Sequence, residues 1–188
     1  MAWLIIITGY ILGSIPTAYF AGRFLKARDI RQMGDENVGA ANAYRELGPV
    51  AGIMVGVIDA AKGAVVILIA QAANLPQAVV LISGAAAVVG HNWPVFLGFR
   101  GGRGVSTTIG ILLVLVTIPV LVLALPTLLV LIFKRNVTPS MAFLFIALPL
   151  VDWLFKVPGV LIAYGVALPA LVGITHYLRT RPRELHQP

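Results

Sequence analysis

Residues 104–133 read GVSTTIGILLVLVTIPVLVLALPTLLVLIF, and the interpretation of this segment decides the topology of the chain. Thirty residues of helix would be about 45 Å long, which is too long for one span of a hydrocarbon core of about 30 Å. Thr117 and Pro119 lie near the middle of the segment, and a proline starts a helix more readily than it continues one. The segment therefore predicts two short helices that meet near Thr117.

Five further apolar segments surround this one, at residues 2–22, 50–73, 76–97, 137–151 and 157–177. Apolar residues make up 59% of the chain and charged residues 11%, whereas soluble domains have about 45–50% and about 25%. This composition predicts an all-α polytopic membrane protein, and we expect residues 1–188 to form a single integral membrane domain.

The distribution of basic residues favours seven transmembrane helices over six. With seven spans and the N-terminus outside, twelve of the fourteen Lys and Arg residues lie on the cytoplasmic side, Lys62 lies in the membrane and Lys156 lies outside. With one long helix over 104–133, eight basic loop residues would lie on one side of the membrane and five on the other. The positive-inside rule therefore predicts an outside N-terminus and a cytoplasmic C-terminus.

Composition also excludes several functions. The net charge of +7 follows from membrane topology, and we expect no nucleic-acid partner because the chain has no aromatic-plus-basic RNA motif. Cysteine is absent, which excludes disulfides, thiolate catalysis and cysteine metal sites. We expect no metal and no cofactor.

The loop Gly98–Gly104, which reads GFRGGRG, has the composition of an anion site. Glycines allow successive backbone N–H groups to converge, the following helix adds unpaired donors at its start, and Arg100 and Arg103 add charge. The loop matches neither the Walker A motif nor the dinucleotide fingerprint. A tight turn with arginines that orient the protein in the membrane is the alternative interpretation.

Other polar residues lie within the apolar segments. His91 falls in the cytoplasmic half of the third segment, where it is either functional or hydrogen-bonded to a neighbouring helix. Asp59 and Lys62 share a helix face, and we expect an internal ion pair before a direct substrate role. Ser14 precedes Pro16, which predicts a kink in the first segment.

Taken together, these strings resemble the bacterial acyl-phosphate-dependent glycerol-3-phosphate acyltransferases, a family of seven-span membrane proteins. The resemblance rests on GSIP at 13–16, NVGAAN at 37–42 with Arg45, DAAKG at 59–63 and GHNWPVFLGFRGGRG at 90–104. It implies transfer of a fatty acyl group from acyl phosphate to the 1-hydroxyl of glycerol 3-phosphate, giving lysophosphatidate and phosphate. This is the first acylation step of phospholipid synthesis, at the cytoplasmic face of the bacterial inner membrane, with membrane lipid as the surroundings.

The resemblance also implies roles for individual residues. The catalytic group comprises His91, Arg103 and His176, without either histidine being the sole general base. The implied phosphate contacts are Asn37, Gly39, Asn42, Arg45, Gly101, Gly102, Gly104 and Thr138, where Thr138 replaces a family serine. The implied supporting residues are Ser14, Asp59 and Lys62.

The chain departs from the family pattern at three positions. Asp35 and Glu36 stand where relatives commonly have serine and glycine, and Arg179 replaces an asparagine. Two carboxylates beside a phosphate site are unfavourable unless they turn away or pair with Arg31 or Arg45. The departures leave open a diverged relative with another acceptor or without activity, a lipid-binding scaffold, and a small anion transporter.

Overall fold

The structure is a computed structural model that describes residues 1–180, and every regular element in this range is a helix. Arg181 and Arg183, which the basic-residue count includes, lie outside the described residues, as does the end of the predicted 1–188 domain. The α-helices are α1 (Ala2–Ser14), α2 (Thr17–Lys26), α3 (Ala40–Leu47), α4 (Pro49–Ala72), α5 (Gln77–Asn92), α6 (Val105–Leu115), α7 (Thr117–Lys134), α8 (Val137–Leu154) and α9 (Gly159–Thr180). The short 3-10 helices are η1 (Ile30–Gln32) and η2 (Val95–Leu97).

The apolar segment at residues 104–133 breaks near Thr117, as predicted. Val116, with φ −135° and ψ 56°, separates α6 from α7. Helix α7 begins at Thr117, whose hydroxyl donates to the carbonyl of Leu113 at 2.7 Å and bridges the break. Six helical stretches within residues 1–180 are long and apolar enough to cross a membrane, and α6, with 11 residues, is a shorter apolar helix. The structure is thus that of a multi-pass membrane protein, and the seventh span stays a prediction.

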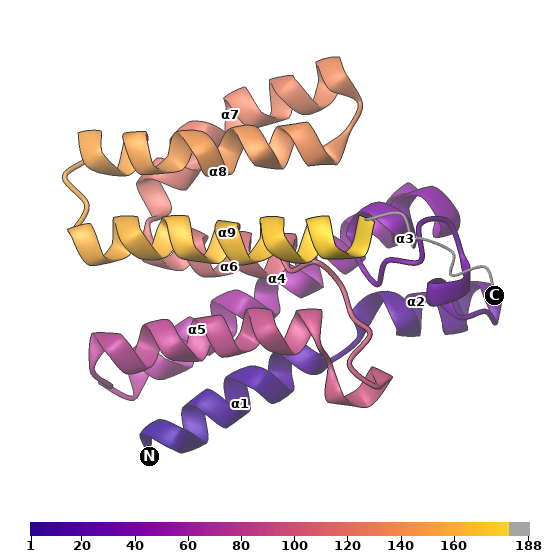
Figure 1. The fold of residues 1–188 in the computed structure, drawn as a ribbon, viewed down its shortest axis with the longest axis horizontal. Helices are drawn as coiled ribbons and strands as arrows, with labels where there is room; N and C mark the ends of the chain where they lie inside the picture. The colour runs from indigo at the N-terminus through magenta and orange to yellow at the C-terminus, as the bar shows by residue number, and fades with distance from the viewer. Residues whose placement is uncertain (181–188) are drawn as a thin grey trace, which may run out of the picture.

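The long helices run back and forth between two ends of an elongated bundle (Figure 1). Helix α1 packs against α5, and α4 packs against α6, while α7 and α8 form a hairpin beside α9. Gly13 permits the first of these contacts, since a Cβ there would overlap the carbonyl of Ala87 on α5. Close backbone approach at small residues is how helices associate without a hydrophobic driving force between them.

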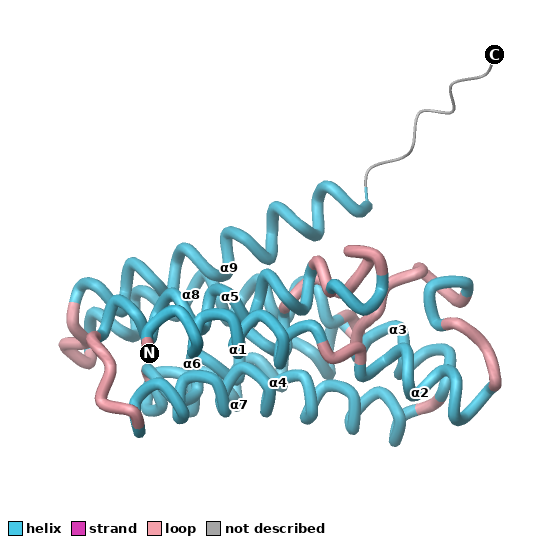
Figure 2. The backbone as a smooth tube through the Cα atoms, turned by 90° about the horizontal axis from the view of Figure 1, so that it is seen from below, coloured by secondary structure: helices cyan, strands magenta, loops and turns pink. Residues whose placement is uncertain are grey.

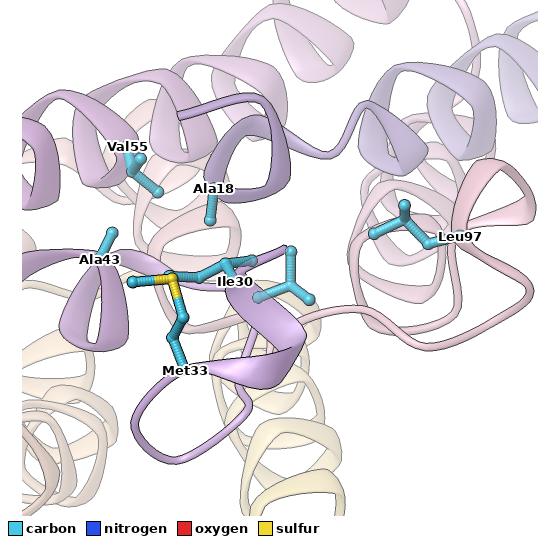
Figure 3. Close-up of a cluster of buried hydrophobic side chains, with 7 residues drawn as sticks. Ala18, Ile30, Met33, Ala43, Val55 and Leu97 are labelled. Carbon is cyan, nitrogen blue, oxygen red and sulfur yellow. The ribbon is translucent and has the colours of Figure 1, made fainter. Parts of the chain in front are cut away.

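Loops of functional interest gather at the end of the bundle that also holds α2 and α3 (Figures 1 and 2). Beneath them lies a small apolar core, in which Ile30 of η1 and Met33 pack with Ala18, Ala43, Val55 and Leu97 (Figure 3). Ile30 is completely buried. This core fixes the 27–39 loop and η2 against α3 and α4, so the polar residues of both loops have defined positions.

A hydrogen-bonded ion pair joins the two loops above this core. Arg31 Nη2 lies 2.7 Å from Asp29 Oδ2, and Arg31 Nη1 donates to the carbonyl of Leu97 at 3.2 Å. The hydrogen bonds from the Arg31 side chain hold the pKa of Asp29 below its usual value, against the opposing effect of burial. The pair therefore stabilises the loop arrangement at neutral pH.

Candidate active site

A large cavity of about 1440 Å³ opens among α3, α4, α6, α8 and α9 at this end of the bundle. Its walls are polar at one end and apolar at the other. The predicted site residues that line it are Asn37, Gly39, Arg45, Asp59, His91, Arg103, Gly104, Thr138 and His176. Residues separated by up to 139 positions in sequence thus line one cavity.

The polar end holds a group of three charged residues, Asp35, Arg45 and Arg103, which we call the cavity trio. Asp35 Oδ2 lies 3.0 Å from Arg45 Nη2 and 3.3 Å from Arg103 Nη2. One carboxylate oxygen therefore faces two guanidinium groups. The negative charge of Asp35 is neutralised by Arg45, one of the two partners that the sequence suggested. Arg103 is a second partner that the sequence did not indicate.

The loop that carries Asp35 is organised by Asn42. This side chain is fully buried, and its amide nitrogen donates to the carbonyls of Ile30, Met33 and Asn37, the last two at 2.9 Å and 3.1 Å. Its oxygen accepts from the backbone N–H of Asp35 at 3.3 Å. Asn42 was expected to contact phosphate, but its side chain lies outside the cavity wall and is occupied by the loop backbone.

Two helices begin at the polar end of the cavity without side-chain caps. Gly39 precedes α3 and Gly104 precedes α6, and neither helix start has a side-chain capping hydrogen bond. Gly104 has a positive φ of 82°, a conformation that glycine adopts without strain. Ser106 in the first turn of α6 and Ala41 in that of α3 also line the cavity. Unpaired N–H groups and the positive ends of two helix dipoles thus face the same space as the arginines.

The glycine loop is held from behind by His91 and Arg179. The backbone N–H of Gly102 donates to the carbonyl of His91 at 3.0 Å, and a Cβ at Gly102 would collide with the His91 ring. Arg179 donates to the carbonyls of Asn92 and Gly101, and to that of Gly102 at 2.6 Å. Gly101 and Gly102 therefore shape the loop from outside the cavity wall.

Arg179 has a function that sequence reasoning missed. The sequence presents it only as a replacement for asparagine and as one more cytoplasmic cation. In the structure, its guanidinium donates to carbonyls 77 to 87 positions earlier in the chain, so no local pattern contains the signal. It fixes the backbone that immediately precedes Arg103.

Asp59 and Lys62 form the expected internal ion pair, with Lys62 Nζ 2.8 Å from Asp59 Oδ1. Lys62 also donates to the carbonyls of Gly13 at 3.3 Å and Ile15 at 2.7 Å. These carbonyls lie at the break between α1 and α2, where Pro16 has no N–H to donate. The predicted kink is present, and Lys62 satisfies the backbone groups that it exposes.

Two further residues predicted from sequence lie around this pair: His91 of the implied catalytic group and Ser14 of the implied supporting group. His91 is buried, and its Nδ1 lies 3.9 Å from Asp59 Oδ1, so both Asp59 and His91 reach the cavity from the protein interior. Ser14 is fully buried outside the cavity wall, beside the kink. Within residues 1–180, no three His, Cys, Asp or Glu side chains come together in a group that could hold a metal ion.

The apolar end of the cavity follows α8 and α9. Successive turns of both helices contribute to it, and the lining residues are Met141, Ala142, Phe145, Ile146, Pro149, Val166, Pro169, Ala170, Val172 and Gly173. From Thr138 to Pro149 the groove follows about 16 Å of helix. A molecule with a charged head and a long apolar tail matches this division.

Comparison with known proteins gives a consistent result. The family model described as glycerol-3-phosphate acyltransferase matches residues 3–182. Glycerol-3-phosphate acyltransferase 4 of Dehalococcoides mccartyi (strain ATCC BAA-2266 / KCTC 15142 / 195) is 48% identical over 98% of this chain and 100% of its own length. Glycerol-3-phosphate acyltransferase 1 of the same strain is 37% identical over 97% of this chain and 90% of its own length.

Solved structures agree with the sequence comparisons. A crystal structure of an integral membrane glycerol 3-phosphate acyltransferase in its glycerol 3-phosphate form is similar with a TM-score of 0.83 and 32% identity, over 94% of this chain and 88% of that one. Its lysophosphatidic acid form is similar with a TM-score of 0.80 and 31% identity, over 93% and 87% of the two chains.

Proposed function

Because the chain belongs to the glycerol-3-phosphate acyltransferase family, we propose that it transfers a fatty acyl group from acyl phosphate to the 1-hydroxyl of glycerol 3-phosphate. The products are lysophosphatidate and inorganic phosphate. The observation that carries the proposal is the divided cavity, in which two arginines and two helix starts lie at one end and an apolar groove between α8 and α9 lies at the other.

Arg45, Arg103 and the N–H groups at the starts of α3 and α6 bind the phosphate groups of the two substrates, with Asn37 and Thr138 beside them. Two anions repel each other, so holding them together is the main physical difficulty of this reaction. Fixed cations and backbone donors reduce that repulsion and stabilise charge on the departing phosphate. Gly101, Gly102 and Asn42 act behind this surface by fixing the loops.

The reaction forms a bond between the 1-hydroxyl oxygen and the acyl carbon, and the bond from that carbon to the phosphate oxygen breaks. The hydroxyl proton passes to a phosphate oxygen, so no dedicated protein base is needed. His91 and His176 line the cavity and orient the reacting groups by hydrogen bonding. Phosphate is a competent leaving group, and positioning is therefore the main contribution of the protein.

The acyl tail lies in the groove between α8 and α9, and the phosphate end faces the cytoplasm. We propose seven spans in the bacterial inner membrane, with the N-terminus outside and the cavity mouth cytoplasmic. This orientation is supported by the arginine-bearing loops, which gather at the end of the bundle where α9 ends and opposite the start of α1 (Figure 1). Membrane lipid surrounds the bundle and supplies the environment of the acyl chain.

The decisive experiment is a reconstitution of the reaction. The protein is purified in detergent and incubated with long-chain acyl phosphate and glycerol 3-phosphate, while phosphate release and lysophosphatidate are measured. We expect both products in equal amounts, and much slower turnover when acyl-CoA replaces acyl phosphate. Absence of both products from a folded preparation, beside an active relative, would exclude the proposed reaction.

A further inference from the structure

Asp35 occupies the position that an anionic ligand of the two cavity arginines would take. Its Oδ2 contacts Arg45 and Arg103 at 3.0 Å and 3.3 Å, although these residues come from different helices and loops. A single oxygen that bridges two guanidinium groups is also the geometry in which a phosphate oxygen is held. The carboxylate and a substrate phosphate therefore compete for the same donors.

The rest of the site retains binding capacity while Asp35 is in place. Among residues 1–180, the buried Nε of Arg103 and the buried Oδ1 of Asn37 have no hydrogen-bond partner. Both residues line the cavity. A carboxylate with one oxygen engaged leaves these polar atoms unsatisfied, whereas a phosphate and its ester carry several oxygens and a hydroxyl-bearing group that can reach more of them.

Asp35 can leave the arginines without unfolding its loop. The backbone N–H of Asp35 is anchored by Asn42 Oδ1, and Asn42 in turn holds three carbonyls of the same loop. The Asp35 side chain itself is 36% exposed, and the Arg45 side chain is 52% exposed. Rotation of one side chain toward solvent is therefore sufficient to vacate the arginines.

We propose that Asp35 is an internal competitor for the phosphate site, which the substrate phosphate must displace from Arg45 and Arg103 in order to bind. Displacement breaks the ion pairs of Asp35 with Arg45 and Arg103, and the displaced carboxylate remains close enough to repel the bound phosphate. Asp35 therefore lowers the affinity for phosphate compounds and favours their release. The proposal rests on the proposed function for the identity of the substrate, but it is tested by binding alone.

The test measures the dissociation constants of inorganic phosphate and glycerol 3-phosphate by calorimetry on the purified protein in detergent. Asp35→Asn keeps the shape of the side chain and removes its charge, and we expect both constants to fall by about fivefold or more, the effect of one partly exposed ion pair. Glu36→Gln is the matched control, since it removes the same charge one position later. Glu36 is exposed and contacts neither arginine through any ion pair within the described range.

A second variant guards against a folding defect. Asp35→Ser replaces the carboxylate with a small neutral hydroxyl, and thermal unfolding of each variant confirms that the protein is intact. Unchanged or weaker phosphate binding in both Asp35 variants, or an equal gain in Glu36→Gln, would overturn the proposal. If turnover is present and binding is unchanged, the proposed reaction stands and the competition fails. If binding tightens without turnover, the competition stands and the reaction fails.

Discussion

Two acid–cation groups among the described residues are alike in distance and unlike in surroundings. Lys62 and Asp59 lie 2.8 Å apart with side chains 7% and 1% exposed, and Lys62 also binds two backbone carbonyls. Arg45 and Asp35 lie 3.0 Å apart, but their side chains are 52% and 36% exposed. Distance alone does not distinguish a structural pair from an exchangeable one, whereas burial and additional partners do.

The strongest way to test this comparison is to break the buried pair. Lys62→Met leaves Asp59 as an uncompensated buried charge and removes the donors to the α1–α2 break, so we expect a loss of about 3–5 kcal/mol in the free energy of unfolding. Denaturant unfolding in detergent measures this change in the free energy of unfolding. In Asp59→Asn with Lys62→Met, the buried charge is gone and part of the stability should return. Wild-type stability in Lys62→Met would show that this pair is not a structural anchor.

Substitution of either arginine of the cavity trio should lower the activity and leave the free energy of unfolding nearly unchanged. We expect Arg103→Ala to lower kcat/KM by about 10²–10³, the usual cost of losing a group that stabilises developing charge. Arg45→Ala should cost less, because its side chain is 52% exposed whereas that of Arg103 is 15% exposed. Steady-state kinetics and unfolding are measured on the same preparations. Full activity in both variants would show that the phosphate groups bind elsewhere in the protein.

The smallest effect is expected at the loop pair Asp29 and Arg31, which is intermediate in burial. The hydrogen bonds from Arg31 lower the pKa of Asp29, so its contribution is complete above the ordinary pKa and is lost as pH falls through the lowered one. Asp29→Asn should therefore be about 1 kcal/mol less stable at pH 7. Unfolding measured from pH 7 downward should show this gap closing, while a constant gap would exclude a role for the charge.

The features predicted from sequence are those with a local physical signal. Thr117 and Pro119 predicted the break between α6 and α7, and Pro16 predicted the kink after α1. Both predictions follow from proline itself, which has no backbone N–H and a restricted φ. The pairing of Asp59 with Lys62 followed from their spacing on one helix. The loop motifs at 37–42 and 90–104 predicted a shared site through family resemblance, and the structure brings both to one cavity.

The features that sequence did not reveal depend on tertiary contacts, some within one loop and others between distant segments. Asn42 is an amide beside a phosphate motif in sequence, yet its nitrogen donates to loop carbonyls and its oxygen accepts from the backbone N–H of Asp35. Arg179 is a terminal cation in sequence, and its role depends on where α9 ends relative to the glycine loop. The contact between Asp35 and Arg103 joins residues 68 positions apart. None of these has a spacing that a linear pattern could express.

The shortness of α6 has a consequence for how two unlike reactants meet. Its 11 residues extend about 16 Å, roughly half of a hydrocarbon core of about 30 Å, and it packs against α4 and α9 within the bundle. In the proposed seven-span arrangement, a helix this short leaves one of its ends inside the hydrocarbon core, and we propose that this end is Gly104, where the phosphate donors lie. On this proposal, the water-soluble acceptor enters to the depth of the lipid, and the fatty chain stays within the bilayer during the reaction.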